Sequence, residues 1–400
     1  MGTLKVEIAF DLNVNGVGDF FTLDNSTKGV LDSSTYPLAG NQLTDISDVV
    51  RKVSIQRGRN RQLEKFTSGT AVITLDNRNR NFDPTYSSSP FFNQILPSRR
   101  VVISDQDVVL YNGVIADWNF NYTLANDSEA EVQCIDALSL LVDPIMTAGS
   151  QTAEKTGARI SSVLDDISWS SSRRDIAIGR VELGTDTVAA DVTGLSYMNK
   201  VAISESGALF INKGGEVTFK DVVDLQRATN TVFGSSDIPF SEIAVEYGIE
   251  EMNNSAIVKW VGGEVKFQDT NSIETYGLFE QTYTTVLPTA LAASSLASYQ
   301  VGVYSEPQYR VDKISVLIHS LPVAKQQEAH NLDLGDVVLV KFHPNNVGSE
   351  IVQAVSIDHI NFDGVQREER KVTFSMSQTA ASFILDSATF GKLDSGILGF

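Results

Sequence analysis

Short segments in which apolar and polar residues alternate occupy both ends of this chain, and this pattern limits the folds that it can adopt. Such segments fill residues 1–145 and return over residues 241–378. Alternation over four to eight residues is typical of half-buried β-strands, and closely spaced short strands are typical of sandwiches and barrels. The sequence therefore predicts a mainly β fold with two β-rich blocks.

The segment between the blocks has helical spacing instead. Two apolar stripes follow the 3.6-residue period: Ile160, Val163, Leu164 and Ile167 in the first, and Leu195, Met198, Val201 and Ala202 in the second. Residues 207–221 then read as two alternating strands around the turn 213–216. These features predict a small α+β module in which two helices pack on a hairpin.

These patterns divide the chain into four parts. We expect a first β-barrel or sandwich at 1–150, the α+β module at 151–240 and a second β-domain at 241–378. A short helix before Pro144 and an Ala-rich helix opened by Pro288 belong to the two β-blocks. Residues 379–400 are apolar but rich in Gly, so we expect an extension that lies across a neighbouring domain or chain or stays loose. No residue-level repeat links the β-blocks, which leaves their duplication open.

Several classes of protein are disfavoured by composition. The chain of 400 residues has no run of eighteen uncharged apolar residues, and its first residues alternate without the apolar core of a signal peptide. Cys134 is the only cysteine, which excludes an internal disulfide and a cysteine-based zinc site. We therefore expect a chain that is made and folded in a reducing cytosol.

Charge is distributed unevenly along the chain. The net charge is −19, yet residues 51–100 contain ten Lys or Arg and only three Asp or Glu. Tight wrapping of nucleic acid is disfavoured, because such binding depends on Lys and Arg that neutralise phosphates. A DNA-binding patch at residues 51–65 is one interpretation of the basic cluster. The other, which we favour, is that it meets an acidic neighbour, since the rest of the molecule is strongly acidic.

The stretch 68–84, SGTAVITLDNRNRNFDP, joins an alternating half to a run of Asn, Asp and Arg. A calcium loop starting at Asn77 would have oxygen ligands at its first, third and fifth positions. It would then need Gly and Glu where the chain has Phe82 and Ser88. The stretch instead predicts a strand that leaves through an Asn/Asp turn and the Asp83-Pro84 pair.

No catalytic constellation is evident. The chain lacks a nucleophile elbow, a zinc-binding His-Glu-x-x-His motif and a P-loop, and Gly16 and Gly18 have no third glycine to complete a dinucleotide site. The four histidines are far apart in sequence: His319, His330, His343 and His359. A metal site built from the last two is a less favoured alternative to histidines scattered over surface and core. We expect no catalytic residue, cofactor or metal, and no enzymatic activity.

An ordered series of short motifs resembles the amino-terminal part of minor tail proteins of long, non-contractile-tailed bacteriophages. The series is Arg57-Gly58-Arg59, Gly69-Thr70, Leu75-Asp76-Asn77, Phe82-Asp83-Pro84, Ser89-Pro90, Pro97 with Arg99-Arg100, and Asn112-Gly113 with Trp118. Members of this family often have Gly where this chain has Asn81. Later segments, 269–277 and 304–316 among them, are similar to the second tube-like domain of tail hub (baseplate hub) proteins.

The resemblance implies a virion protein of the tail tip. Such hubs are homotrimers in which each chain contributes two tube-like β-barrel domains to a ring around the DNA channel. The implied partners are the tail tube or distal tail protein, other minor tail proteins and the tape-measure protein, while DNA passes without specific binding. The exit loop after residue 76 would face a neighbouring subunit, and the basic segment would meet an acidic patch. The candidate inter-subunit residues are Arg57, Arg59, Arg61, Arg78 and Arg80.

Two other functions remain as alternatives. A receptor-binding tail-tip protein would recognise a host glycan or protein, and four aromatic residues are candidates for stacking on sugars: Trp118, Trp169, Tyr276 and Tyr304. A tail-associated cell-wall hydrolase is less favoured, because nothing selects a pair of carboxylates among the fifty acidic residues.

Overall fold

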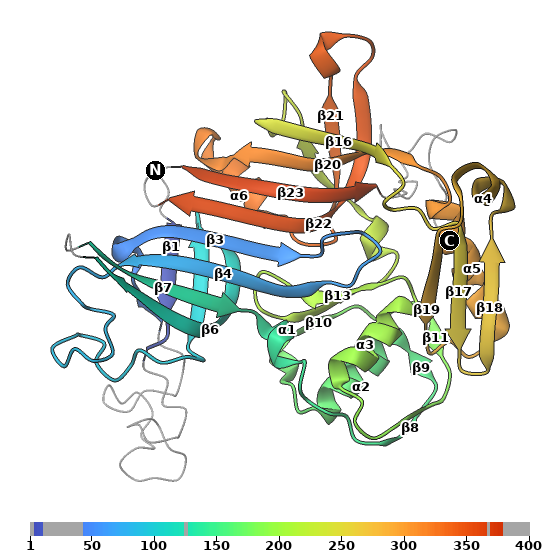
Figure 1. Ribbon diagram of the computed structural model, residues 1–400, viewed down its shortest axis with the longest axis horizontal. Coiled ribbons are helices and arrows are strands. Elements are labelled where there is room, and N and C mark those ends of the chain that lie inside the picture. The colour runs from blue at the N-terminus through green and yellow to red at the C-terminus, as the bar shows by residue number, and fades with distance from the viewer. Residues whose placement is uncertain (1–3, 11–42, 124–126, 366–368, 379–400) are drawn as a thin grey trace.

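The computed structural model describes residues 4–10, 43–123, 127–365 and 369–378, so the predicted extension at 379–400 and the glycines at 16 and 18 lie outside the described residues. The described chain is mainly β, with a large sheet to one side and a helix-containing part beside it (Figure 1). The predicted fold class, mainly β with an α+β insert, is confirmed.

A single sheet of thirteen strands contains strands from both ends of the chain. The first β-region consists of β1 (Leu4–Ile8), β2 (Thr44–Asp45), β3 (Val50–Gly58), β4 (Thr67–Asp76), β5 (Arg100–Asp105), β6 (Val108–Tyr122) and β7 (Ser128–Ile135). The second β-region consists of β15 (Ala228–Phe233), β16 (Glu242–Gly248), β20 (Gln308–Leu317), β21 (Val337–Phe342), β22 (Ile351–Val365) and β23 (Arg370–Gln378).

The two β-regions lie side by side, because β3 pairs with β22 in the strand order β16-β20-β23-β22-β3-β4-β7-β6-β5-β1-β2 (Figure 1). Alternation decides which side chains are buried: on β4, Ala71, Ile73 and Leu75 point into the core and are at most 1% exposed. Their hydrophobic cluster continues into the second region, where Val316 and Phe374 belong to it. The regions therefore share one continuous core.

The α+β region follows the first β-region. Its short strands are β8 (Gly149–Gln151), β9 (Glu154–Lys155), β10 (Arg174–Ile176), β11 (Glu182–Leu183), β12 (Asp186–Val188), β13 (Ala208–Ile211) and β14 (Val217–Lys220). Helices α2 (Thr156–Asp166) and α3 (Gly194–Ile203) pack on the β13–β14 hairpin, as the sequence predicts. The predicted helix before Pro144 is only one turn, α1 (Ala137–Leu140), capped by the Asp136 carboxylate.

Residues 252–305 form a separate layer that the alternating pattern alone does not distinguish from the second β-region. Strands β17 (Ser255–Trp260), β18 (Gly263–Gln268) and β19 (Glu280–Thr284) form a small sheet covered by α5 (Ala290–Tyr304), with α4 (Thr270–Tyr276) at one end. The α5 helix begins after Thr289, whose hydroxyl accepts from the Ala292 N–H, so Pro288 precedes the helix instead of opening it. Helix α6 (Val323–Asn331) packs beside β6 of the first region.

Candidate functional site

The pairing of β3 with β22 is the seam between the two β-regions, and we call it the β3–β22 junction. Its antiparallel register places Ile55 opposite Phe362 and Ser54 opposite Asp363. Ile55 and Phe362 are each 2% exposed, and the Ser54 hydroxyl donates to the Asp363 carboxylate over 2.8 Å. The junction therefore buries apolar side chains on one face and is linked by polar groups on the other.

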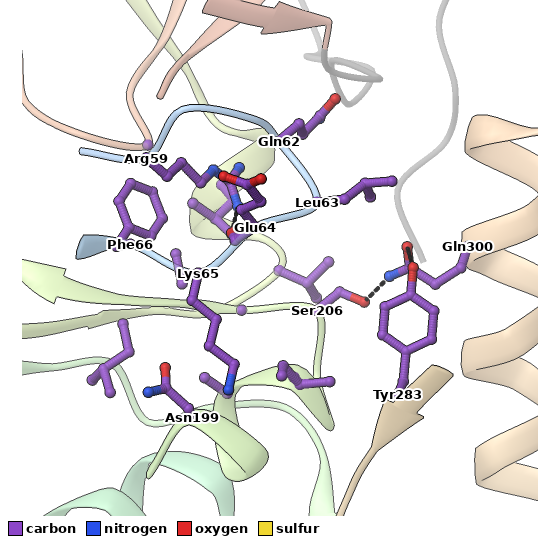
Figure 2. A pocket seen from close by; sticks show the side chains of 18 of the residues that line it. Arg59, Gln62, Leu63, Glu64, Lys65, Phe66, Asn199, Ser206, Tyr283 and Gln300 are labelled. Atoms are coloured by element: carbon purple, nitrogen blue, oxygen red, sulfur yellow. Dashed lines mark hydrogen bonds between the residues drawn. The ribbon is translucent and has the colours of Figure 1, made fainter. Parts of the chain in front are cut away.

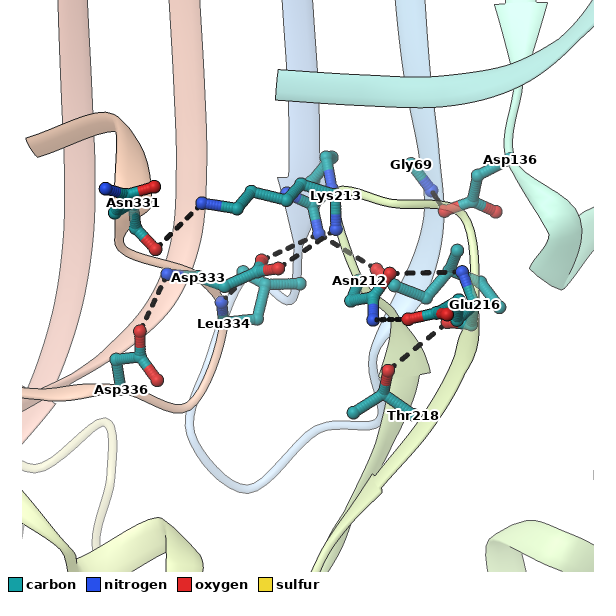
Figure 3. A network of polar contacts seen from close by, with 12 residues as sticks. Gly69, Asp136, Asn212, Lys213, Glu216, Thr218, Asn331, Asp333, Leu334 and Asp336 are labelled. Carbon is teal, nitrogen blue, oxygen red and sulfur yellow. Dashed lines mark hydrogen bonds and ion pairs between the residues drawn. The ribbon is translucent and has the colours of Figure 1, made fainter. Parts of the chain in front are cut away.

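A buried arginine fixes the end of this junction. The side chain of Arg57 is 4% exposed, and its Nη2 donates to Asp333 Oδ1 at 2.7 Å and to the Ile211 carbonyl at 2.9 Å. Asp333 precedes β21 and Ile211 ends β13, so one guanidinium joins both β-regions to the α+β hairpin. The Lys213 N–H at the hairpin turn also donates to Asp333 Oδ2, over 2.9 Å (Figure 3).

Two groups in this network, Asp333 and Lys213, have shifted pKa values. Burial by itself raises the pKa of Asp333, but the charge of Arg57 and the N–H groups of Lys213 and Leu334 outweigh it and hold the pKa below its ordinary value. Burial lowers the pKa of Lys213, whose Nζ donates to the Asn331 carbonyl (Figure 3). The Asp333 carboxylate is therefore charged at neutral pH and held by its neighbours.

The loop after β3 makes two more contacts with acidic residues. Arg59 donates through Nε and Nη2 to Asp358 Oδ1, at 2.9 and 2.7 Å, and its guanidinium lies 4.7 Å from the centre of the Phe66 ring. Arg61 is 54% exposed, and its Nη2 lies 3.8 Å from the equally exposed Glu250. An exposed pair at that distance contributes little to stability.

The basic segment therefore meets acidic residues of the second β-region within its own chain, as the acidity of the rest of the molecule predicts. The enclosed position of Arg57 differs from the predicted role at a subunit surface. Strand alternation gives the signal, because Arg57 shares its face of β3 with Val53 and Ile55, which are buried. The sequence gives no comparable signal for the partners, because Asp333 lies 276 residues from Arg57 and Asp358 lies 299 residues from Arg59.

The predicted exit loop follows β4, and its polar side chains stabilise its own turns. The Asp83 carboxylate accepts from the Thr85 hydroxyl and N–H, from Arg80 at 2.7 Å and from the Tyr122 hydroxyl at 3.0 Å. These hydrogen bonds, led by those of Thr85, hold the pKa of Asp83 well below its usual range. Asn77 Oδ1 accepts from the Phe82 N–H at 3.0 Å. Loop geometry thus explains the Asn/Asp run.

A groove of about 750 Å³ lies between this loop and the second half of β6. We call it the β6 groove, and its walls are Arg78, Arg80, Asp83, Pro84, Thr85, Phe120, Tyr122, Thr123 and Ser128. Arg78 and Arg80, both predicted as inter-subunit contacts, are 61% and 50% exposed here. Arg78 pairs with Asp76 and lowers the pKa of that carboxyl to about 2. Both guanidiniums remain accessible to a further partner.

A second cavity, of about 290 Å³, lies where the loop after β3, the end of α3, β19 and α5 meet (Figure 2). The Gln300 amide donates to the Ser206 hydroxyl over 2.9 Å, and the Tyr283 hydroxyl accepts from Asn253 at 2.8 Å. Burial raises the pKa of Tyr283. The hydroxyls of Ser206 and Tyr283 thus both have side-chain partners at this cavity, which lies between structural units.

The aromatic residues considered for sugar stacking have different surroundings. Trp118 stacks on Phe82, with ring centres 6.1 Å apart, and packs against the main core. Burial raises the pKa of Tyr304, while Tyr276 is 41% exposed. Trp169 carries the Arg173 guanidinium over its ring. They do not form one exposed platform.

Within the described ranges, no three His, Cys, Asp or Glu side chains are arranged to hold a metal ion. The Nε2 atom of His330 lies 2.9 Å from Asp105 Oδ2 in the core, and that of His343 lies 2.8 Å from the Gly348 carbonyl. None of the helices in the part of the chain that the structure describes is long and apolar enough to cross a membrane.

Comparisons by sequence find no relative: no family model matches the chain, and no curated protein matches it. Solved structures are similar in fold. The tail protein from Neisseria meningitidis MC58 matches with a TM-score of 0.58 at 9% identity, over 95% of this chain and 97% of that one. The 43 kDa tail protein of prophage MuSo2 from Shewanella oneidensis matches with a TM-score of 0.54 at 12% identity, over 85% of this chain and 96% of that one.

Proposed function

We propose that this chain is a structural protein of a bacteriophage tail tip, a hub that joins the tail tube to the distal tip and surrounds the channel for DNA. The observation that carries the proposal is the end-to-end likeness in fold to two tail proteins, which covers nearly the whole of both. The motif series from Arg57 to Trp118 supports the same assignment. On this proposal the protein acts by assembly and has no catalytic site.

The domain organisation that we propose has a tube-like domain in residues 1–150, another in 241–378 and the α+β domain between them, with the difference that β15 pairs with β21 and so adds residues 228–233 to the second tube-like domain. The β3–β22 junction supports it, because the two β-regions lie next to each other, which is the arrangement that consecutive members of a ring would need. Three copies would then contribute six such regions around the channel. The tail tube or distal tail protein would lie on one side of this ring, with other minor tail proteins and the tape-measure protein as further partners.

The net charge of −19 suits a channel through which DNA slides. Nucleic-acid binding depends on Lys and Arg that neutralise phosphates, and a negative wall repels the same phosphates. Within the segment 51–65, Arg57 and Arg59 do little to offset this repulsion, because they are already paired with Asp333 and Asp358. DNA is therefore expected to pass without specific binding.

Immunogold electron microscopy of intact virions, with antibody raised to this chain, tests the proposal. Label confined to the tail end away from the capsid, with three copies per tail by quantitative mass spectrometry, is the expected result. Label along the whole shaft would make the protein a tube component. Absence of the chain from purified particles would refute a structural role in the virion.

A further inference from the structure

The two β-regions repeat one strand order. In the first it is β3-β4-β7-β6-β5-β1, and in the second it is β16-β20-β23-β22-β21-β15. Each of these six strands has a counterpart at the same place in the strand order and in the same succession along the chain, whereas β2 of the first region has none. One strand departs from the repeat, since β1 is antiparallel to β5 whereas β15 is parallel to β21. The regions are thus two versions of one module.

Local irregularities recur at the same positions. The long strand of each module, β6 or β22, shifts register just after an isoleucine, Ile115 or Ile357. The carbonyl of Ile115 accepts from the Ser98 N–H at 2.7 Å, and that of Ile357 accepts from the Gly335 N–H at 2.8 Å. Ser98 and Gly335 both have the left-handed backbone, with φ of 60° and 74°. β-Bulges are specific features, so this agreement fixes the alignment of the modules.

The alignment shows a repeat in the sequence. Counted from the two isoleucines, residues 115–122 (IADWNFNY) correspond to 357–364 (IDHINFDG), with Ile, Asn and Phe in common. Counted through the neighbouring strands, residues 52–58 (KVSIQRG) of β3 correspond to 242–248 (EIAVEYG) of β16. The strands that form the β3–β22 junction therefore both have counterparts, β16 for β3 and the second half of β6 for the second half of β22.

Those counterparts have open edges. In the described residues, β16 pairs only with β20 and ends the sheet, while the part of β6 from Asp117 to Tyr122 pairs only with β7. The two edges lie at opposite ends of the row of strands (Figure 1). An open edge presents unpaired N–H and C=O groups to any strand that can align with it. Each module thus leaves one strand edge unpaired: the second module at β16, and the first at the second half of β6.

We infer that β16 of one copy adds in antiparallel orientation to the second half of β6 in a second copy, with the register that β3 and β22 use within one chain. The pairing itself follows from the internal repeat, and its closure into a ring of three rests on the proposed function. Such a contact joins unlike surfaces, so it adds copies head to tail and closes a ring when the rotation permits.

The register makes specific pairs. Phe120 comes to lie opposite Val245, where the junction has Phe362 opposite Ile55. The junction pair is 2% exposed on each side, whereas Phe120 and Val245 are only half-buried in the single chain. In the proposed contact, Phe120 and Val245 would cover each other's exposed surface, as Phe362 and Ile55 do in the junction.

A second pair replaces charge with apolar surface. The alignment gives Arg57 and Asp333 the counterparts Tyr247 and Leu96, which are 67% and 44% exposed. In the predicted register Tyr247 faces Trp118, and the Trp118 indole N–H donates to the Leu96 carbonyl at 3.2 Å. The two exposed apolar side chains therefore meet at the position where the internal junction has its buried ion pair.

Charged side chains of opposite sign would lie at the rim of this contact, although each already has an opposite charge nearby in its own chain: Lys371 for Glu242, Asp76 for Arg78 and Asp83 for Arg80. Thr123, in the wall of the β6 groove, would face Glu242, whose side chain is 72% exposed. Arg78 and Arg80 line the same groove. Opposite charges at the rim speed association and fix register. The exit loop would thus contact a neighbouring subunit.

Disulfide trapping tests the register. Asn121 and Ala244 are exposed and would be directly opposed, as Ser54 and Asp363 are in the junction. The double variant Asn121→Cys/Ala244→Cys should form covalent oligomers on oxidation, with loss of the monomer band on a non-reducing gel. The native Cys134 does not interfere, because it is buried and burial raises its thiol pKa.

Two matched controls define the outcome. Ser54→Cys/Asp363→Cys should close within one chain, and the shifted pair Asp117→Cys/Ala244→Cys, about 13 Å out of register, should not link. If the internal control links while the Asn121/Ala244 pair stays monomeric, or if the shifted pair links equally, the inference is refuted. This failure is independent of the virion label, which tests the tail-tip assignment.

A charge transplant gives a second measurement. Tyr247→Arg should shift the sedimentation of the protein toward the monomer, because it places an unpaired cation in an apolar contact. Adding Leu96→Asp should restore assembly by rebuilding the Arg57–Asp333 pair between copies. Both positions are exposed in the single chain, so folding is preserved. Equal sedimentation of the wild type and of Tyr247→Arg would overturn the inference.

Discussion

Replacement of Arg57 by methionine, which keeps the length of the side chain and removes its charge, tests whether the two β-regions are held together by a buried ion pair. The wild-type guanidinium is 4% exposed and contacts Asp333 at 2.7 Å and the Ile211 carbonyl at 2.9 Å. Breaking a buried pair by removing one partner costs about 3–5 kcal/mol. Asp333 keeps N–H donors from Lys213 and Leu334, so we expect about 3 kcal/mol, at the lower end of this range.

The assay is urea unfolding of wild type and variant. If the free energy of unfolding depends on urea concentration with the same slope in both, a change in midpoint reports a change in stability. The matched control is Arg61→Met, whose arginine is 54% exposed and lies 3.8 Å from Glu250, and which should cost less than about 1 kcal/mol. If the two variants unfold at the same urea concentration, the ion pair does not hold the junction and the reasoning is wrong.

The pH dependence gives a second check on the same pair. The folded-state pKa of Asp333 is lowered from 3.8, so the stability that it contributes is present above that value and is lost as pH falls through the folded pKa. In Arg57→Met the Asp333 carboxylate loses the opposing charge and keeps only the N–H groups of Lys213 and Leu334, so its folded-state pKa lies higher than in the wild type. The difference in free energy of unfolding between wild type and variant should therefore be largest at neutral pH and should decrease as the pH falls below about 4. A difference that stays constant down to pH 2 would contradict this account.

Three further results are expected. Gly58→Ala should destabilise the junction by about 1–3 kcal/mol in urea unfolding, because φ is +127° and an added Cβ would lie 2.1 Å from the Asp358 carbonyl oxygen; an unchanged midpoint would contradict it. Cys134 should resist a thiol reagent at pH 8 in the folded chain and react after unfolding, since burial raises its thiol pKa; rapid labelling of the native protein would show an accessible core. Arg78→Glu/Arg80→Glu should weaken self-association in sedimentation and leave the free energy of unfolding in urea within about 1 kcal/mol of wild type, whereas Arg61→Glu should leave association unchanged.

Local structure follows from the sequence wherever one pattern dominates. The alternation in residues 69–75 and 108–120 predicts β4 and β6, and the apolar stripe from Ile160 to Ile167 predicts α2. Helix α6 is missed because its residues, VAKQQEAHN, are mostly polar and form no apolar stripe. Pro322 just before it is the signal that could have located its start.

Long-range structure is predicted less well, for a physical reason. The β3–β22 junction joins strands about 300 residues apart, and no local property of either strand selects the other. The internal repeat is hidden because its common residues are few, and because the bulges after Ile115 and Ile357 must be known before the segments align. For the candidate site, the sequence predicts Arg78 and Arg80 on a projecting loop, and both are exposed there in the structure. The burial of Arg57 can be predicted only after one has decided which face of β3 points into the core.

The repeat explains why two similar modules can occupy one chain without exchanging their contacts. The internal junction has the Arg57–Asp333 pair, and a buried charge that loses its partner is strongly destabilising. The open edges have Tyr247 and Leu96 at the equivalent positions, with no charge to compensate. If β3 of one copy paired with the open edge of β6 in another, Arg57 would lie against Leu96 and its guanidinium would be buried without a partner. This pairing is therefore disfavoured. The difference in chemistry between two geometrically similar seams therefore directs β3 to β22 within a chain and leaves β16 and β6 for a second copy.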